Sequence, residues 1–416
     1  MRFSGFADEW NEDYLNKLFD NSNERNFESL EVLSVTINNG VLKRSDLGSD
    51  RKNKDKKSMK HVLKGDLVYN PMFMWKGASG ISSYEGITSA DYIVLKSKNN
   101  VNPIFFSHLF QTEKSLNKFK NYSQGSLLER LRLMYPQFSD IKMAFPSYEE
   151  QEKIANLLTF VDNKLELIEK KYQTYLDFKK YLMQQIFTQK LRFDFKDTWD
   201  KVLLKDVAFI PKKTKLTNVE GLKLLTVKLH TKGIEINDRI KPKLTKRGRP
   251  YYIRRSGELL IGRQNFHNGG MGIVPKSLDG GICSNAISSF NVFEDKIDVN
   301  YLYYFLARPE YYIKSERLIG GTGQKEFSEK ELLKLKIDLP SLEEQNKIVD
   351  FLLNIDHKIE LSENQLNKTQ EFKKGLLQQM FVVRINWRCN FKLVKSPSFN
   401  KHLLILKNKI IFIIIK

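Results

Sequence analysis

The chain has 416 residues and an excess of positive charge, with 69 Lys and Arg residues against 49 Asp and Glu residues and a formal net charge of +20 at pH 7. A hydrophobic fraction of 41% allows buried cores in two or three domains. The charge predicts a polyanionic partner, with nucleic acid the first candidate and an anionic membrane surface the second. Two cysteines exclude a disulfide framework and a zinc-binding set. Since no run approaches the roughly 18 apolar residues of a membrane span and the first residues do not begin a signal peptide, we expect a cytoplasmic protein without a membrane partner.

Two stretches of mixed α/β character are predicted, at 1–145 and 191–339. Short runs rich in β-branched and aromatic residues predict strands at 30–35, 92–95, 224–227 and 288–292, and helices are expected near 103–116 and 300–305. The two stretches repeat each other faintly, since Gly65-Asp66-Leu67 corresponds to Gly257-Glu258-Leu259. We therefore predict two related globular domains.

In the first stretch, the polar segment 51–57 is a basic loop, a composition that also suits an ordinary solvated surface loop. The segment 70–77 mixes an amide, aromatic rings and a cation after a predicted strand, so it can present base-edge donors beside apolar surface. Met72, Phe73 and Trp75 are expected to close the core instead. The candidate DNA-binding residues here are Lys43, Arg44, Arg51, Lys52, Asn70 and Lys76.

The segment 146–190 is predicted to form one long helix, and it occurs again at 340–383 with an offset of 194 residues, Ser147 to Ser341. Pro-Ser followed by Glu150 or Glu344 predicts a helix start with a capping box. The apolar positions form a heptad seam, with residues Ile154, Leu158, Val161, Leu165, Ile168, Tyr172 and Tyr175 in the first copy and Ile348, Leu352, Ile355 and Ile359 in the second. Two amphipathic helices that each pack on their own domain remain an alternative, but two such seams most simply bury each other.

The second stretch carries a basic segment, 239–257, with eight Lys or Arg residues and no acid, a composition typical of a phosphate-contacting face. The segment 262–270 then runs from a strand end into a glycine turn. Its Arg, Gln and Asn side chains are plausible base readers, since Arg pairs with guanine and Gln or Asn with adenine, although an ordinary surface loop remains the alternative. The candidate DNA-binding residues here are Lys241, Lys243, Lys246, Arg247, Arg249, Tyr251, Arg263, Gln264, Asn265, His267, Asn268, Gln324 and Lys325.

The helical pattern ends after the second copy, and the residues 384–416 form an atypical basic tail that we expect to be disordered. Its run 410–415 is apolar but too short to span a membrane. The composition resembles translation of adenine- and thymine-rich sequence past the usual end, and an interaction segment is the alternative. No function is assigned to this tail.

The order of domain, helix, domain, helix resembles the specificity subunit of type I restriction-modification enzymes. So do the motif Pro-Ser-x-Glu-Glu-Gln-x-Lys-Ile in both helices and the segments 65–75 and 262–272, so that the resemblance covers about 1–383. In that family each globular unit is a target recognition domain for one half of a split DNA sequence. The repeated helices pair antiparallel as a coiled-coil spacer and dock the methyltransferase subunits. The resemblance implies a mixed α/β fold with an internal pseudo-two-fold repeat.

The resemblance also implies the partners, which are double-stranded DNA, two methyltransferase subunits and motor/nuclease restriction subunits. S-adenosylmethionine, ATP and Mg are expected on those partner subunits, and no cofactor in this chain. The residues agree that the chain is not an enzyme, because Asn70-Pro71-Met72-Phe73 only approximates the Asn-Pro-Pro-Phe box of adenine methyltransferases and 320–325 lacks the Gly-Lys-Ser/Thr ending of a phosphate-binding loop. The six histidines show no metal-binding spacing.

Two functions of different classes fit the sequence. The first is a DNA-specificity subunit that reads an asymmetric split target and docks methyltransferase subunits on repeated outer helix faces, marked by Asp162, Lys164, Glu166 and by Asp356, Lys358, Glu360. The second is a non-catalytic scaffold whose coiled coil joins two protein-binding domains. The strength of salt-dependent DNA binding distinguishes them.

Overall fold

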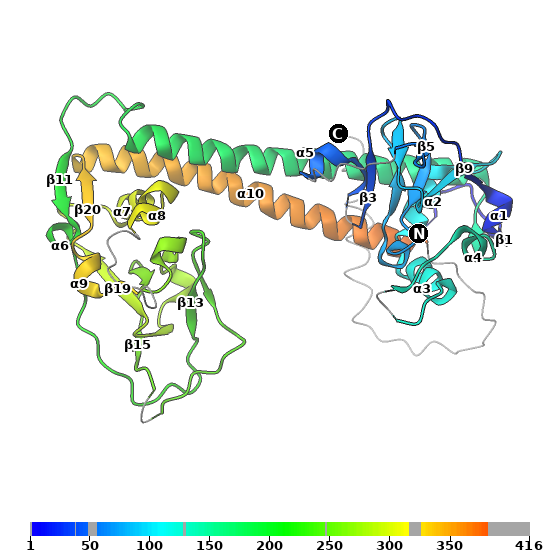
Figure 1. Cartoon of the computed structure of the whole chain (residues 1–416). Coiled ribbons are helices and arrows are strands. Elements are labelled where there is room, and N and C mark those ends of the chain that lie inside the picture. Colours follow the sequence, from blue (N-terminus) through cyan, green and yellow to red (C-terminus); the bar gives the residue numbers. More distant parts are fainter. Residues whose placement is uncertain are drawn as a thin grey trace. The chain divides into compact units, whose positions relative to one another are not determined.

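The structure is a computed structural model that describes residues 2–37, 39–48, 56–127, 130–245, 248–315 and 326–381. The described residues form two compact units: unit 1 contains 2–160 together with 373–381, and unit 2 contains 161–372. The predicted tail at 384–416 lies outside the described residues. Each unit contains a group of strands and short helices (Figure 1).

Unit 1 is built on an antiparallel four-stranded sheet of order β2-β9-β6-β7, flanked by two-stranded pairs β1-β10, β3-β4 and β5-β8. Helices α2 and α3 supply a largely aromatic core in which Phe106, Phe110 and Phe119 are fully buried. The elements in chain order are β1 (Asn11–Tyr14), α1 (Leu15–Leu18), β2 (Phe19–Ser22), β3 (Leu33–Thr36), β4 (Gly40–Lys43), η1 (Arg44–Leu47), β5 (Lys60–Val62), β6 (Leu67–Tyr69), η2 (Met74–Lys76), β7 (Ser79–Ile81), β8 (Gly86–Thr88), β9 (Ile93–Ser97), α2 (Pro103–Phe110), α3 (Glu113–Tyr122), α4 (Tyr135–Ser139) and β10 (Lys142–Phe145).

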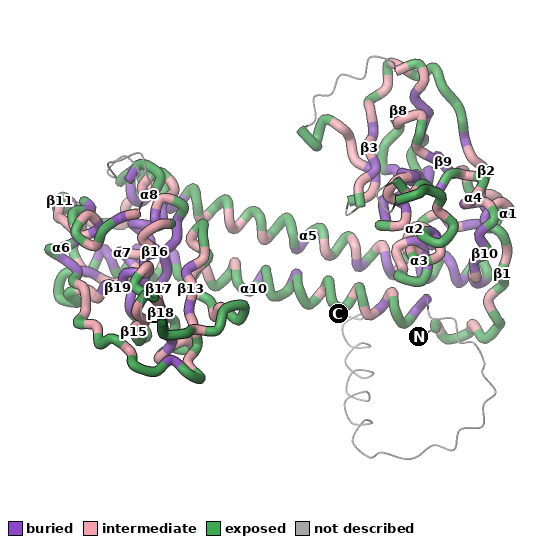
Figure 2. The backbone as a smooth tube through the Cα atoms, turned by 60° about the horizontal axis from the view of Figure 1, so that its bottom comes forward, coloured by how far each residue is buried: buried purple, intermediate pink, exposed green. Residues whose placement is uncertain are grey.

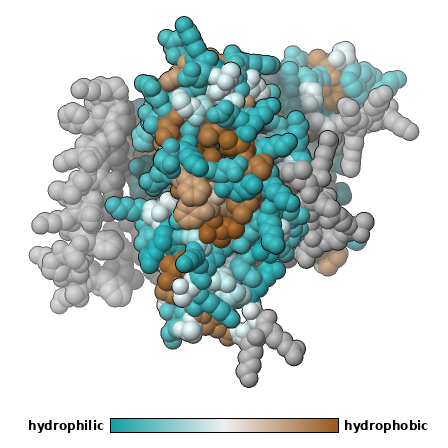
Figure 3. All heavy atoms as spheres, turned by 90° about the vertical axis from the view of Figure 1, so that its left-hand side faces the viewer, coloured by the Kyte–Doolittle hydropathy of each residue, from teal (hydrophilic) through white to brown (hydrophobic). Residues whose placement is uncertain are grey.

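Unit 2 repeats this topology, with a four-stranded sheet of order β12-β19-β16-β17 and the pairs β11-β20, β13-β14 and β15-β18. The face of this unit drawn in Figure 3 is largely hydrophilic, with apolar residues gathered near its middle. The elements are β11 (Asp200–Leu203), α6 (Leu204–Val207), β12 (Ala208–Phe209), β13 (Leu225–Val227), β14 (Ile234–Ile236), β15 (Tyr251–Ile253), β16 (Leu259–Gly262), η4 (Phe266–Asn268), β17 (Met271–Ile273), η5 (Lys276–Leu278), β18 (Ile282–Ser284), β19 (Ile287–Val292), α7 (Val299–Leu306), α8 (Pro309–Ser315), α9 (Glu329–Leu332) and β20 (Lys336–Leu339).

The matching strand orders confirm the prediction of two related α/β domains. All four predicted strands exist, as β3, β9, β13 and β19, and the predicted helices correspond to α2 with the start of α3 and to α7. The expected strand before 70–77 is β6, which lies between β9 and β7 in the sheet and whose three residues are all buried.

The two repeated segments form the helices α5 (Tyr148–Phe187) and α10 (Leu342–Met380), and these helices pack together as predicted. The seam extends over ten positions in each helix, spaced alternately by four and three residues from Ile154 to Ile186 and from Ile348 to Met380, and every one of these positions is buried or partly buried. Figure 2 shows the resulting alternation of buried and exposed residues along both helices. None of the described helices has an apolar stretch long enough to cross a membrane.

Contacts within unit 2 give the relative direction of the helices. Lys179 forms an ion pair with Asp356 at 2.5 Å, and seven residues earlier on α5, Tyr172 lies close enough to Glu363 for its charge to help raise the pKa of the phenol, although burial is the larger cause. A residue seven positions earlier on α5 therefore faces a residue seven positions later on α10. The helices are antiparallel in this unit.

The repeated Glu-Glu-Gln motif fastens each helix start to its own domain. In unit 2, Glu344 is 1% exposed and accepts hydrogen bonds from Arg192 Nε at 3.0 Å, Arg192 Nη2 at 2.7 Å and Trp199 Nε1 at 3.0 Å. Gln345 accepts from the backbone N–H of Asp298, the N-cap of α7, at 2.9 Å. We call this set of contacts the clasp.

Unit 1 contains the equivalent clasp. Glu150 is 1% exposed and accepts from Arg2 Nε at 2.9 Å and Arg2 Nη2 at 2.5 Å, and this hydrogen bond raises the pKa of Arg2. Gln151 accepts from the backbone N–H of Asn102, the N-cap of α2. The carboxylates of Glu150 and Glu344 bond arginine side chains, so the predicted role of these two glutamates in a capping box is replaced by a long-range ion pair.

Candidate nucleic-acid interface

In unit 1, the segment between β6 and β7 folds as a tight turn around the short helix η2. Asn70 is 7% exposed, its side-chain Oδ1 accepts from the N–H of Met72 at 3.1 Å and its Nδ2 donates to Tyr92 Oη at 3.3 Å. Met74 is fully buried, and Gly77 ends the turn with φ = +92°, a conformation that favours glycine. Lys76 remains outside, with its ammonium 4.8 Å from the ring centre of Trp75.

In unit 2, the segment between β16 and β17 folds in the same way around η4. Phe266 is fully buried in the position that Met74 has in unit 1, and Gly269 ends the turn with φ = +68°. A Cβ on Gly270 would lie 2.8 Å from both Cβ and the backbone oxygen of Asn265, so only glycine fits. The two turns are therefore equivalent at an offset of 192 residues, Gly77 to Gly269.

A second segment docks on each turn through an equivalent backbone bond. In unit 1 the N–H of Leu133 donates to the carbonyl of Pro71 at 3.0 Å, and in unit 2 the N–H of Phe327 donates to the carbonyl of Arg263 at 3.0 Å. The residues that precede Leu133 and Phe327 in the chain therefore lie at equivalent positions beside the two turns. These residues are Arg132 in unit 1, which is exposed, and Glu326 in unit 2.

Glu326 binds two of the predicted base readers. Its Oε1 accepts from Arg263 Nε at 2.8 Å and from Arg263 Nη2, and its Oε2 accepts from Gln264 Nε2 at 3.3 Å. Burial disfavours ionisation of Glu326, but the hydrogen bonds and charge of Arg263 outweigh it, so the pKa of Glu326 lies below its usual value. The carboxylate is consequently ionised at neutral pH.

Further charged groups surround this pair. Lys213 forms an ion pair with Glu329 at 2.6 Å, and Ser288 Oγ donates to the same carboxylate at 3.0 Å. Arg249 is exposed and near enough to contribute to lowering the pKa of Glu326. A cluster of alternating charge thus lies at the edge of the unit 2 turn.

The loop before β14 contacts the other side of the same turn. The N–H groups of His230 and Thr231, both with positive φ, donate to the carbonyls of Asn268 and Gly269 at 2.8 and 2.9 Å. Next to this loop, a groove of about 780 Å³ lies in unit 2 between α5, α7 and α10, and its lining includes Lys179, Lys180 and Lys232. The turn is therefore held by two backbone hydrogen bonds from this loop, and the loop itself borders a groove lined in part by lysines.

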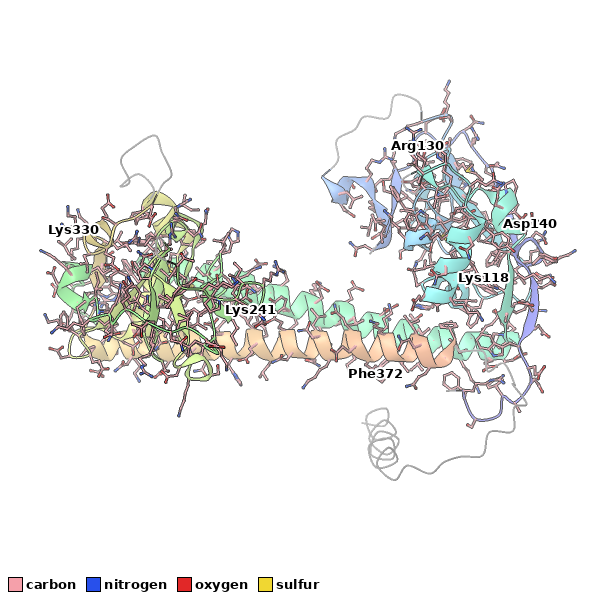
Figure 4. All side chains as sticks on the ribbon, turned by 90° about the horizontal axis from the view of Figure 1, so that it is seen from below. Lys118, Arg130, Asp140, Lys241, Lys330 and Phe372 are labelled. Carbon is pink, nitrogen blue, oxygen red and sulfur yellow. The ribbon has the colours of Figure 1, made fainter. Side chains whose placement is uncertain are left out.

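The other predicted residues have varied positions. Lys43 pairs with Glu31 at 3.0 Å, and the hydrogen bond to Glu31 raises the pKa of Lys43. Arg44 Nε donates to Ser34 Oγ at 3.3 Å. Exposed candidates in unit 2 are Lys241, which is labelled in Figure 4, Lys243, Arg249, Asn265 and Asn268. Partly exposed candidates are Tyr251 and His267, and candidates outside the described residues are Arg51, Lys52, Lys246, Arg247, Gln324 and Lys325.

One residue of the predicted phosphate-contacting segment is not at the surface. Arg254 is 1% exposed, its Nη2 donates to the carbonyl of Ile287 at 3.0 Å and its guanidinium lies over the Tyr252 ring. Its neighbour Arg255 is exposed and pairs with Asp279 at 3.5 Å. Counting Arg254 as part of the phosphate-contacting face was wrong, since the backbone of Arg254, just after β15, is hydrogen-bonded to Gly280 and Gly281 and its side chain is buried.

The sequence analysis missed Arg132, Lys213 and Glu326. Aligning the two stretches at the offset of the helices, 194 residues, would have placed Arg132 opposite Glu326. Their position beside the turns depends on contacts between segments more than 60 residues apart, which the sequence does not display. Among the described residues, no group of three or more His, Cys, Asp or Glu side chains is arranged to hold a metal ion.

Comparison with known proteins gives the class of this fold. A family model described as "Type I restriction modification DNA specificity domain" matches residues 16–174 and again 196–371, one match for each repeat. The chain therefore belongs to the type I restriction-modification specificity subunit family.

Individual relatives agree. The chain is 25% identical over 338 residues to the type I restriction enzyme MjaVIII specificity subunit of Methanocaldococcus jannaschii, covering 76% of this chain and 78% of that protein. It is 24% identical over 351 residues to the putative type I restriction enzyme MjaX specificity subunit of the same organism, covering 78% and 79%. The crystal structure of a type I restriction-modification system S subunit from M. genitalium has the same fold, with a TM-score of 0.61 and 14% identity over 90% of this chain and 96% of that one.

Family membership decides between the two functions that the sequence left open. The chain is a DNA-specificity subunit of a type I restriction-modification system, so the protein-binding scaffold is set aside. The family is non-catalytic and carries no cofactor; S-adenosylmethionine and ATP belong to partner subunits. These findings confirm the predictions for catalysis and cofactors.

Proposed function

We propose that the chain reads an asymmetric split sequence in double-stranded DNA, with one half-site for each unit. The observation that carries this proposal is the pair of equivalent turns, η2 and η4, each rigidly held and each bordered by polar or basic side chains. Backbone of the same shape positions different side chains at the two sites. Because base recognition depends on donors and acceptors, different side chains select different bases.

The chemical difference between the turns is large. Unit 1 presents Pro71 with the cation Arg132 beside it, and unit 2 presents Arg263 with the carboxylate Glu326 beside it. Arg132 is exposed and suited to guanine or phosphate, whereas Glu326 already neutralises one cation. The two half-sites are therefore expected to be unrelated in sequence. A palindromic methylation target would contradict the proposal.

The remaining exposed cations supply contacts to phosphate. Lys241, Lys243 and Arg249 are exposed on the same basic stretch, and such contacts strengthen binding to all DNA sequences alike while making it dependent on salt. The test is DNA binding by the full complex between about 50 and 200 mM salt, where affinity falls by about 10³- to 10⁵-fold for 6 to 10 phosphate contacts. A complex that fails to bind DNA at low salt would refute the proposed function.

We also propose that α5 and α10 dock two methyltransferase subunits, with the motor/nuclease restriction subunits joining outside them, in the cytoplasm. Large apolar side chains remain exposed at repeat-equivalent positions of unit 2, Leu167 (69%) with Leu361 (55%) and Phe178 (46%) with Phe372 (42%, labelled in Figure 4). The two members on each helix are 11 residues apart, which places them about 20° apart around the axis and about 16 Å apart along it. Duplicate apolar surfaces support duplicate partners.

One predicted docking residue is otherwise engaged. Asp356 accepts from Tyr304 Oη at 2.6 Å and pairs with Lys179, so it contributes to the helix-domain contact of unit 2 and is not a free outer-face charge. Native mass spectrometry at saturating methyltransferase concentration tests the stoichiometry. The expected mass contains two copies per specificity chain, and a mass with a single copy would contradict duplicate docking.

A further inference from the structure

The carboxylate of Glu326 occupies an unexpected place for a DNA-recognition surface, because it faces two side chains that are suited to bind bases. It accepts two hydrogen bonds from Arg263 and one from Gln264. The side chains of Arg263 and Glu326 are 26% and 27% exposed, so the pair is neither buried in the core nor fully solvated. A partly exposed pair at a reading turn has access to DNA.

The position of Glu326 is fixed by the residues around it. The N–H of Phe327 donates to the carbonyl of Arg263 at 3.0 Å, and the fully buried rings of Phe327 and Phe266 meet edge to face with centroids 5.3 Å apart. The N–H of Arg263 itself donates to the carbonyl of Ala286 at 3.0 Å. Both backbones are therefore anchored, and the ion pair is part of a built arrangement rather than a chance encounter of two long side chains.

The geometry of the pair leaves the reading edge of Arg263 unoccupied by Glu326. A guanidinium has five N–H donors, and Glu326 receives the one on Nε and one of those on Nη2. The two N–H groups of Nη1 and the outer one of Nη2 are not used by this carboxylate. The Nη1 and Nη2 edge is the edge that pairs with O6 and N7 of guanine through two parallel hydrogen bonds.

We propose that Glu326 is a specificity-determining positioning residue, which holds the guanidinium of Arg263 with its outer edge directed toward one guanine of the second half-site. This inference rests on the proposed function. A free arginine side chain loses much rotamer freedom when it binds a base, whereas one held by a carboxylate has already lost it. The same carboxylate repels phosphate and so opposes binding of Arg263 to the DNA backbone at wrong sites.

The experiment uses the full chain assembled with its methyltransferase subunits and a set of duplexes in which each base pair of both half-sites is varied in turn. The variants are Glu326→Gln, which keeps the shape and removes the charge, Glu326→Ala and Arg263→Ala. The control is Glu331→Gln, which removes a charge from the capping box of α9 on the same segment, where Glu331 accepts from the N–H of Ser328 at 2.7 Å. Melting temperatures show whether each variant is folded. If Glu326→Ala is unfolded, the result for Glu326→Gln tests the proposal.

The expected result is a loss of about 10- to 100-fold in discrimination at one base pair of the second half-site, at the same pair for all three variants. The three variants keep their discrimination throughout the first half-site. The control Glu331→Gln keeps the discrimination of the wild-type complex at both half-sites. The double variant Arg263→Ala with Glu326→Ala is no less selective than Arg263→Ala alone, because Glu326 acts through Arg263.

Two results would overturn the inference while leaving the proposed function intact. If Glu326→Gln tightens binding to every duplex equally, the carboxylate competes with DNA and does not position Arg263. If Arg263→Ala relaxes a base pair and Glu326→Gln does not, Arg263 reads DNA without help. A wild-type complex that discriminates between no duplexes would instead refute the proposed function, and the inference with it.

Discussion

Substitution of Glu344 by Gln tests whether the repeated helix motif has a structural role. The side chain is 1% exposed and receives three hydrogen bonds, two from Arg192 and one from the indole of Trp199. Glutamine keeps the volume but removes the charge, and its amide group cannot accept from all of these donors. The guanidinium of Arg192 is left beside a neutral group.

The size of the effect follows from burial. Removing one partner of a buried ion pair costs about 3–5 kcal/mol, and because Arg192 is 20% exposed and keeps some hydration, we expect about 3 kcal/mol for Glu344→Gln. In unit 1, Arg2 is 32% exposed and supplies the described hydrogen bonds to Glu150, so Glu150→Gln should cost about 2 kcal/mol. For a unit of roughly 150–250 residues these losses lower the melting temperature by about 6–12 °C and 4–8 °C.

Differential scanning calorimetry of the purified full-length chain measures both losses, with the exposed neighbour Glu343→Gln as the matched control. The control should change the free energy of unfolding by no more than about 0.5 kcal/mol. Equal melting temperatures for Glu344→Gln and Glu343→Gln would refute the clasp. A changed methylation sequence at unchanged stability would show that the motif acts in recognition instead.

Three further outcomes are expected. Arg132→Ala relaxes one base pair of the first half-site or weakens binding to all duplexes, measured on the same duplex set, and leaves the second half-site unchanged. Burial raises the pKa of the Cys283 thiol to about 11, so the contribution of this thiol to folding stability is complete below the pKa of an unfolded thiol and is lost as the pH rises toward 11. In a Cys389→Ala background, alkylation of Cys283 at pH 9 should be far slower in the folded than in the unfolded chain. Equal alkylation rates would contradict this prediction. Inserting seven residues after Ile168 and after Ser362 keeps the seam in phase to within about 20° and lengthens each helix by about 10 Å, so methylome sequencing should show a gap longer by roughly one to three base pairs with both half-sites retained.

Sequence reasoning succeeded where the determining interactions are local. The Pro-Ser start and the alternating spacing of four and three predicted both α5 and α10, because helix start signals and seam periodicity lie within one segment. Strands such as β19 were predicted for the same reason, since β-branched and aromatic composition is a property of the strand itself.

It failed where the partner is distant in the chain. Glu344 has the spacing of a capping residue, and the Ser341 hydroxyl does accept from its N–H at 3.4 Å, but the Glu344 carboxylate bonds Arg192, 152 positions away, instead of completing the capping box. Arg254 is indistinguishable by composition from its exposed neighbours, and its burial depends on hydrogen bonds to Gly280, Gly281 and Ile287, which lie more than 25 residues away in the chain. Glu326 carries no motif, because its importance comes from the backbone bond between Phe327 and Arg263.

The central claim is that this chain alone selects the DNA sequence that its system modifies, through two unlike half-sites. Methylome sequencing of cells that contain the methyltransferase subunits, with and without this chain, tests the claim directly. With the chain present, one asymmetric split motif should be methylated, and without it that motif should lose its methylation completely. A palindromic motif, or a motif that is methylated equally in both cell types, would contradict the account.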